Sequence, residues 1–180
     1  MRILKENTAA FVIDIQERLF PVMYEKENLL KNCEILVAGL VELSVPLIVT
    51  QQYTKGLGET LSEIKSHIPD FSYIEKRNFS CCDELSAVEK LKETGAENVI
   101  ICGIESHICV LQTAVDLKEA GLNPVIVMDC VSSLTKESIA AAKERLRYEG
   151  IMMTSSESVL FELTRSSSAP EFKAISKLIK

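Results

Sequence analysis

The feature that most constrains this chain is a regular alternation of short apolar runs with amphipathic stretches along its whole length. The apolar runs are continuous, as in strands buried on both faces of a parallel sheet. The stretches between them repeat apolar residues at helical spacing. This alternation predicts strands at 8–15, 46–50, 71–76, 99–102, 124–128 and 151–154, and helices at about 29–41, 87–94, 107–120 and 135–149.

Three glycines support the predicted helix ends. Gly95, Gly121 and Gly150 each follow a predicted helix, and glycine readily takes the left-handed conformation that ends one. Strand and helix alternation predicts an α/β fold, a three-layer doubly wound sheet of six mainly parallel strands in the order 3-2-1-4-5-6. Since no repeat or linker interrupts the pattern, residues 1–180 are expected to form a single domain.

Two later helices carry capping signals. Thr154 with Glu157, and Ser168 with Glu171, fit the capping box. The last helix, 170–179, has apolar residues at helical spacing and could pack on its own domain or on a partner subunit.

The predicted strand order brings two reactive residues to one crevice. In doubly wound sheets, ligands bind beyond the carboxyl ends of the strands, where the winding reverses. Strands 1 and 4 are neighbours at that point in the order 3-2-1-4-5-6. Asp14 ends strand 1, and the turn from Gly103 to Cys109 follows strand 4, so the two side chains should converge.

Cys109 lies where a strand turns into a helix, so backbone N–H groups and the helix dipole would lower its thiol pKa. A core-filling thiol is the alternative there. His107 lies two residues away, which on a helix is roughly 200° around the axis, and therefore cannot easily act as its base. A carboxylate remains, and Asp14 is the best placed, although it could equally be a helix N-cap. Taken alone, Lys76 is interpreted as a surface residue, because lysines are mostly exposed.

Composition sets the class of protein. The net charge of −6 argues against nucleic-acid binding, which depends on basic contacts to phosphate. The six cysteines lack the spacing of a disulfide framework or a zinc site, and the N-terminal apolar stretch is too short for a signal peptide. A cytoplasmic protein with no membrane partner is therefore expected.

Five motifs in order resemble the isochorismatase-like cysteine hydrolase superfamily, in particular the short isochorismatase domain-containing proteins. The resemblance runs over nearly the whole chain. It is carried by Val12–Gln16, Val49–Thr60, Glu75–Ser80, Gly103–Val110 with Gln112–Asp116, and Asp129–Ser133.

The resemblance implies an Asp14–Lys76–Cys109 triad. Asp14 would take the thiol proton, Lys76 would hold the charges, and Cys109 would attack a carbonyl or nitrile-like carbon. It also implies a cis bond between Ile104 and Glu105, which would aim the N–H groups of Ile108 and Cys109 at an oxyanion.

The chain also departs from known members. Nicotinamidases of the superfamily bind a metal through Asp-x-His and a further His, whereas 52–58 here holds neither carboxylate nor imidazole. Isochorismatases use acid catalysis and need no cysteine. We therefore expect a metal-independent hydrolase without a cofactor, which cleaves a small amide-like C–N bond through a Cys109 thioester. A non-catalytic binding or scaffold protein with a reactive thiol is the alternative, and a nuclease is a third.

Four further residues are candidates for substrate contact. The resemblance implies that Gln52 faces the substrate, although it could instead cap a loop. Gln16 could likewise cap the segment after the first strand, and Phe20 and Phe79 could wall the pocket or belong to the core. Asp129 could line the cleft but more readily caps the following segment. The expected partner is a small-molecule substrate, and relatives suggest a homo-oligomer, a dimer or larger.

Overall fold

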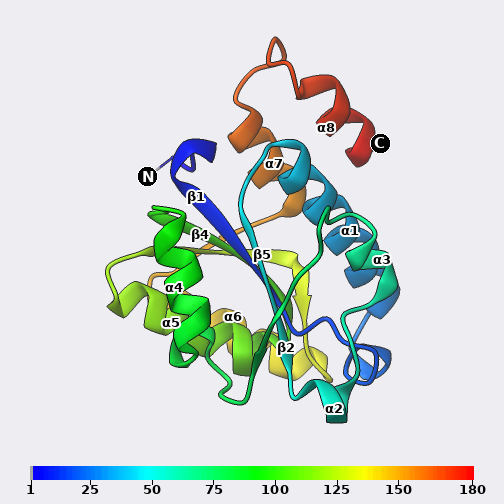
Figure 1. Ribbon diagram of the computed structural model, residues 1–180, viewed down its shortest axis with the longest axis vertical. Coiled ribbons are helices and arrows are strands. Elements are labelled where there is room, and N and C mark those ends of the chain that lie inside the picture. Colours follow the sequence, from blue (N-terminus) through cyan, green and yellow to red (C-terminus); the bar gives the residue numbers. More distant parts are fainter. Residues whose placement is uncertain (1) are drawn as a thin grey trace.

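The computed structural model describes residues 2–180, in which six strands form one sheet (Figure 1). The order is β3-β2-β1-β4-β5-β6 and every neighbouring pair is parallel, which confirms the predicted fold class. The strands are β1 (Thr8–Ile13), β2 (Leu47–Gln52), β3 (Ile74–Lys76), β4 (Asn98–Ile104), β5 (Asn123–Ser132) and β6 (Met152–Thr154).

Helices cover both faces of the sheet (Figure 1). One face carries α1 (Lys26–Glu42), α3 (Ser62–Lys65), α7 (Ser156–Thr164) and α8 (Phe172–Ile179), and the other carries α4 (Leu85–Glu93), α5 (Leu111–Glu119) and α6 (Lys136–Tyr148). The remaining pieces are α2 (Thr54–Leu57), the 3₁₀ turns η1 (Lys5–Asn7), η2 (Phe20–Val22) and η3 (Cys81–Asp83), and the π-helical turn η4 (Ser106–Val110).

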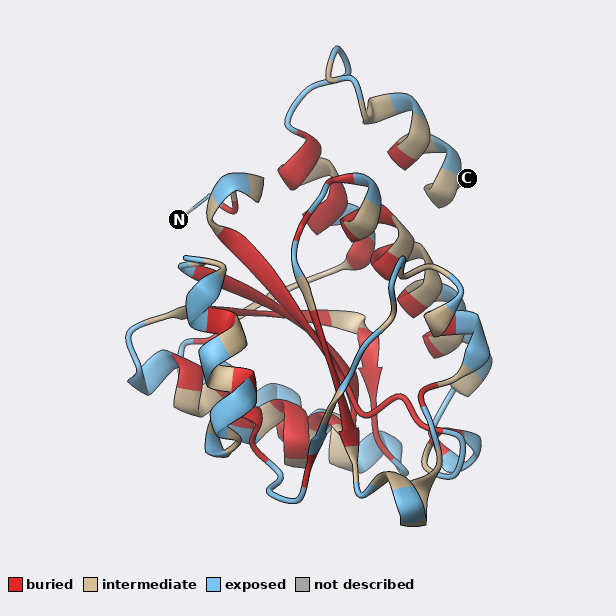
Figure 2. Ribbon diagram, in the orientation of Figure 1, coloured by how far each residue is buried: buried red, intermediate tan, exposed pale blue. Residues whose placement is uncertain are grey.

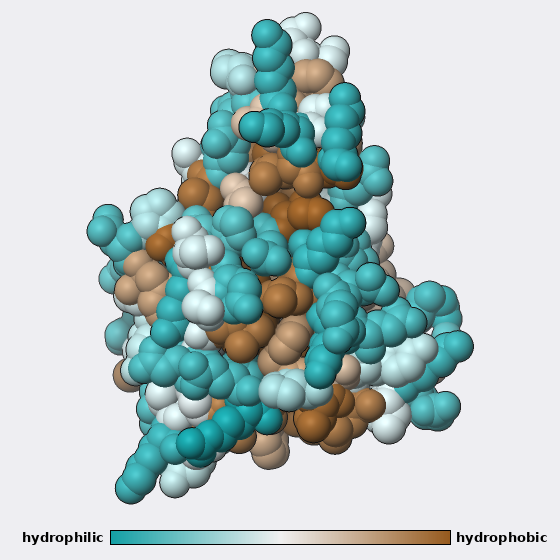
Figure 3. Space-filling model, turned by 90° about the vertical axis from the view of Figure 1, so that its right-hand side faces the viewer, coloured by the Kyte–Doolittle hydropathy of each residue, from teal (hydrophilic) through white to brown (hydrophobic). Residues whose placement is uncertain are grey.

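The sheet separates two apolar cores. β1 and β4 are buried along their full length, as continuous apolar runs require (Figure 2). The side of the molecule that Figure 3 shows is mainly hydrophilic at its edges, with apolar side chains gathered between the polar ones. No helix in residues 2–180 is long and apolar enough to cross a membrane.

The capping predictions were wrong in detail. The side chain of Ser155, not Thr154, accepts the N–H of Ser158 at the start of α7. α8 starts at Phe172 without a side-chain cap, because Glu171 already has helical backbone angles. α8 packs against α1 and α7 of its own chain, with Ile175 fully buried.

One glycine fixes how closely β1 and β4 approach. Gly103, paired with Ile13, has φ +122°, and an added Cβ would lie within 2.7 Å of the Ile13 nitrogen and nearer still to its carbonyl oxygen. Asp14 follows Ile13 directly, so this approach also sets where Asp14 sits.

We predict that Gly103→Ala costs about 3 kcal/mol of unfolding free energy, through overpacking against fixed backbone together with backbone strain. Gly121→Ala is the matched control, because Gly121 also has positive φ, +83°, but nothing lies within 4 Å of its added Cβ. It should lose about 1 kcal/mol, from strain alone. Urea unfolding measures both, and equal losses would contradict the role of the close approach.

Candidate active site

Three chemically active side chains meet at the carboxyl edge of the sheet. Asp14 follows β1, Lys76 ends β3, and Cys109 lies in η4 after β4. They are 0%, 1% and 7% exposed, respectively. The crossover connections of the parallel sheet bring these distant segments to one edge, as the predicted strand order required.

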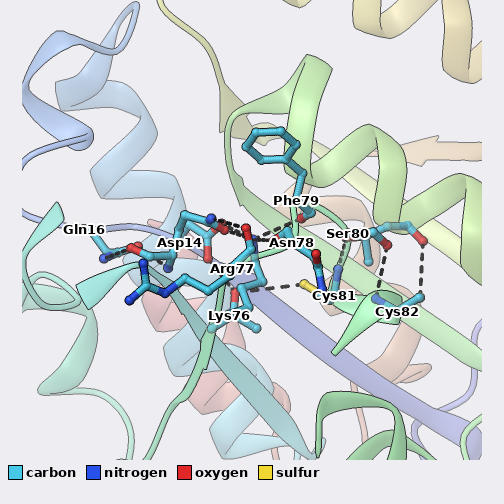
Figure 4. Close-up of polar contacts among 12 residues, drawn as sticks. Asp14, Gln16, Lys76, Arg77, Asn78, Phe79, Ser80, Cys81 and Cys82 are labelled. Carbon is cyan, nitrogen blue, oxygen red and sulfur yellow. Dashed lines mark hydrogen bonds and ion pairs between the residues drawn. The ribbon is translucent and has the colours of Figure 1, made fainter. Parts of the chain in front are cut away.

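The Lys76 ammonium lies at the centre of the cluster (Figure 4). Its Nζ donates to Gln52 Oε1 at 2.8 Å and to the carbonyl oxygens of Phe79 at 3.0 Å and Asn78 at 3.2 Å. Asp14 Oδ2 lies 2.7 Å away. Burial opposes the charge on Lys76, but the nearby anionic groups, Asp14 first among them, leave its pKa raised, so Lys76 is a cation.

The two oxygens of Asp14 have different surroundings. Oδ1 accepts the hydroxyl of Thr50 at 2.7 Å. Oδ2 forms the ion pair with Lys76 Nζ and has no further hydrogen-bond partner within residues 2–180. Because Oδ1 is already bonded to Thr50 and each carboxylate oxygen has two lone pairs, Oδ2 is the oxygen that can also receive a proton from a neighbouring group.

Cys109 is that neighbouring group. Burial, followed by the Asp14 charge, raises the pKa of the Cys109 thiol to about 12, against an opposing effect of Lys76. The predicted lowering of this pKa was therefore wrong: η4 is a short π-helical turn, and burial beside a carboxylate outweighs any dipole. With that pKa, Cys109 is a neutral thiol at neutral pH, and it lies beside the Asp14–Lys76 ion pair.

The turn that carries Cys109 has the expected backbone form. The peptide bond between Ile104 and Glu105 is cis. The Ile108 N–H, expected to face an oxyanion, instead donates to the carbonyl oxygen of Glu105 at 3.1 Å. Ile108 is therefore not a free donor here, because the turn uses its N–H to close on itself.

His107 points to another partner. Its Nδ1 lies 2.9 Å from the hydroxyl of Ser133 at the end of β5. This contact agrees with the geometric argument that His107 does not serve Cys109 as a base.

The four predicted substrate residues have different surroundings. The side-chain oxygen of Gln52 accepts a hydrogen bond from Lys76 Nζ, and its amide nitrogen donates to the Arg77 carbonyl oxygen at 2.8 Å. Gln16 is fully buried. Its amide nitrogen donates to the Gln52 carbonyl oxygen and its amide oxygen accepts the Gln52 N–H, so it holds the end of β2. Phe20 packs in the α1-side core, across the sheet from Cys109.

Phe79 contributes to the cluster in an unexpected way. Its carbonyl oxygen accepts from Lys76, whereas its ring is exposed and points away from the Asp14–Lys76 pair (Figure 4). Only the backbone of Phe79 is therefore part of the site.

Sequence reasoning missed two residues beside the triad. Thr50 holds Asp14, and Cys81 is a fully buried thiol 4.0 Å from the Thr50 hydroxyl. A polar Thr50 at the end of an apolar strand was the available signal for the first. No sequence signal marks Cys81 as a site residue, because buried free cysteines are common in protein cores.

Metal ligands are not gathered in this region. Among residues 2–180, no group of three or more histidine, cysteine, aspartate or glutamate side chains is arranged to hold a metal ion. In the segment where nicotinamidases carry such ligands, Gln52 instead serves Lys76.

Asp129 caps a helix rather than lining the site. Its carboxylate accepts hydrogen bonds from the backbone N–H of Ser156 at 2.8 Å and from the Ser156 hydroxyl at 2.6 Å. Ser156 is the first residue of α7. Asp129 therefore holds α7 against β5. The prediction that it caps the segment directly after it was wrong, because its carboxylate bonds to Ser156, 27 residues further along the chain.

Comparison with known proteins gives consistent matches over this architecture. The family model described as the isochorismatase domain matches residues 8–158. A secreted isochorismatase effector of Phytophthora sojae is 37% identical over 185 residues, covering 99% of this chain and 87% of its own. Isochorismatase domain-containing protein 2 of Danio rerio is 35% identical over 179 residues, covering 99% and 89%.

A solved structure agrees closely with this fold. The MAR1 ribonuclease from Caenorhabditis elegans superposes with a TM-score of 0.94 at 37% identity, covering 99% of this chain and 92% of that one.

Proposed function

Because the chain belongs to the isochorismatase family, we propose that it is a hydrolase that cleaves a small amide-like C–N bond through a thioester at Cys109. The observation that carries the proposal is the buried cluster of a neutral thiol beside an ion-paired carboxylate and ammonium. Such a set can deprotonate the nucleophile without changing the net charge of the cluster.

The chemical steps follow from these contacts. Asp14 Oδ2 takes the thiol proton as the Cys109 sulfur attacks the carbonyl carbon, and Lys76 offsets the negative charge. Asp14 then gives that proton to the departing nitrogen, which leaves as an amine, and the acyl group stays on sulfur. In the second half, Asp14 takes a proton from water, the hydroxide adds to the thioester, and the acid leaves as the thiol is restored.

The test combines turnover and trapping. The protein is incubated with a panel of small amides, amine or ammonia release is followed, and the intact mass is recorded for an acyl adduct on Cys109. We expect one chemical class to turn over and to leave an adduct that disappears with time. Amine release without any adduct on Cys109, even after rapid acid quenching, would contradict the thioester.

The pH dependence of Cys109 alkylation separates this proposal from a scaffold role. With a thiol pKa of about 12, iodoacetamide should react with Cys109 at a rate that still rises from pH 9 to pH 11. Asp14→Asn removes a charge that raises this pKa, so the rate profile should move to lower pH. At a fixed pH below the pKa, the alkylation rate should rise roughly tenfold for each unit by which the pKa falls. Peptide mass mapping assigns the label to Cys109.

Turnover should change in the opposite direction. Asp14→Asn gives more thiolate but has no base, so amide hydrolysis should fall although alkylation rises. A wild-type profile that levels off near the ordinary thiol value of about 8.5 would instead favour a binding or scaffold protein that retains the fold.

Ribonuclease activity is the second candidate, because the C. elegans relative carries that name. The net charge of −6 works against binding a polyanion. RNA incubated with wild-type protein and with Cys109→Ala should remain intact in both. Cleavage by wild type that Cys109→Ala abolishes would replace the amide with RNA as substrate.

We further propose that the protein forms a homo-oligomer. Large apolar side chains are exposed on segments that follow strand carboxyl ends, namely Val22 after β1, Phe79 after β3 and Leu134 after β5. Contact between copies would remove these surfaces from water. Light scattering should give a multiple of the 20.0 kDa chain mass, and a single-chain mass would contradict this.

We also propose a cytoplasmic location. All six cysteines are free, which is typical of reducing compartments. The Phytophthora relative is named as secreted, so fractionation of the source cells is the direct test.

A further inference from the structure

The turn that carries Cys109 is attached to the residues that follow β5. Three consecutive residues of the turn make the contacts, namely Glu105, Ser106 and His107. Leu134 N donates to Glu105 Oε2 at 3.2 Å. The Ser133 hydroxyl oxygen lies 2.6 Å from the Ser106 hydroxyl and 2.9 Å from His107 Nδ1. Ser133 is fully buried, and one hydroxyl thus contacts the first two residues of η4.

A serine hydroxyl suits this double contact. It has one proton to donate and two lone pairs to accept with. It can therefore bond to Ser106 and to His107 together, whichever ring nitrogen of His107 carries the proton. A residue without this hydroxyl would leave Ser106, itself 1% exposed, without its partner.

Ser133 also holds the segment that follows β1. Its carbonyl oxygen accepts the N–H of Tyr24 at 2.9 Å. The segment after β1 begins at Asp14. Ser133 is thus attached to both of the loops that carry the proton-transfer pair.

An irregularity in β5 puts Ser133 within reach. β4 advances from Ile101 to Gly103, by two residues, while its partner advances from Ile126 to Val131, by five. The extra residues bulge out of the sheet, and Asp129 within them is held by Ser156 and, at its carbonyl, by Asn32. Bulges re-aim side chains near functional sites, and this one directs the end of β5 toward η4.

We propose that Ser133 is a positioning residue, whose hydroxyl fixes the η4 turn so that the Cys109 thiol stays beside Asp14 and Lys76. Ser133 does not touch the reacting atoms and acts through Ser106 and His107. The inference rests on the proposed role of Cys109 as nucleophile. It accounts for the Asp129–Ser133 motif, which the proton-transfer steps themselves do not use.

The experiment compares Ser133→Ala with Ser132→Ala. Both substitutions remove a buried serine hydroxyl at the end of β5, but that of Ser132 does not reach η4. The first readout is the pH midpoint of Cys109 alkylation by iodoacetamide, and the second is kcat and KM for an amide substrate. Ser106→Ala removes the other end of the same hydrogen bond and replaces Ser133→Ala if that variant does not fold.

We expect Ser133→Ala to move the alkylation midpoint toward the ordinary thiol value by at least about one pH unit, because the thiol leaves its buried place beside Asp14. It should also lower kcat about tenfold or more with KM little changed, as misplacement of a reacting group does. Ser132→Ala should keep the wild-type midpoint and kcat.

Two results would overturn the proposal. One is an unchanged midpoint in Ser133→Ala or, where that does not fold, in Ser106→Ala. The other is an equal shift in Ser132→Ala, which would reflect general loosening of β5. The alkylation readout needs no substrate, so a wild-type protein that hydrolyses no amide would refute the proposed function while the positioning role is still decided.

Discussion

Cys109→Ala should lower kcat/KM for the amide substrate by at least about 10⁴-fold, because removing the nucleophile of a catalytic triad leaves only binding and electrostatic effects. Cys109→Ser should be nearly as inactive, because an alkoxide is much harder to form than a thiolate. Initial rates at saturating and limiting substrate measure both.

The matched control is Cys82→Ala, which removes a partly buried thiol that lies outside the triad. It should keep the wild-type rate. Equal rates in Cys109→Ala and wild type would remove Cys109 from the mechanism. Turnover that depends on Cys81 instead would transfer the nucleophile to the second thiol near Asp14.

Asp14→Asn should reduce the free energy of unfolding by about 3–5 kcal/mol, because it leaves the Lys76 ammonium buried without its counter-charge. Both side chains of this pair are 0% exposed, so water cannot replace the lost partner. Lys76→Met should cost a similar amount. The double variant should cost clearly less than the sum of the two single losses, because neither charge then remains uncompensated.

Urea unfolding at neutral pH gives these values. Glu149→Gln is the surface control, because the pair between Glu149 and Arg145 has the same 2.7 Å separation but is exposed on the arginine side. It should change stability by less than about 1 kcal/mol. A loss of that small size for Asp14→Asn would show that the buried pair does not contribute to stability as an electrostatic unit.

The fold could be predicted from the sequence because its determinants are local and repeated. Each apolar run and each helical stretch is visible in a short window, and the alternation leaves few topologies for a parallel sheet. The strand ends were less certain: Asn123–Ser132 extends well beyond the predicted 124–128, since its later part continues through a bulge that a periodic pattern does not reveal.

The candidate site could be predicted only in part. The strand order predicts that Asp14 and Cys109 lie at one crevice. Lys76 is predicted only by the family resemblance, because a lone lysine in the sequence is typical of the surface, whereas in the structure it ends β3 and is buried. Phe20 and Phe79 illustrate the limit. Both flank the crevice in sequence, yet one ring packs in the far core and the other is exposed.

By itself, the sequence determined the alternating elements and a thiol after the fourth strand, because periodicity and residue type act over a few neighbouring positions, and it favoured the commonest doubly wound strand order. Only the tertiary structure decided the electrostatics of that thiol. Its raised pKa, the buried ion pair of Asp14 with Lys76 and the hydrogen bonds of Ser133 to the η4 turn all arise from burial and from contacts between segments far apart in the chain. Such contacts have no signature within a local window, so they emerge only when the chain is folded.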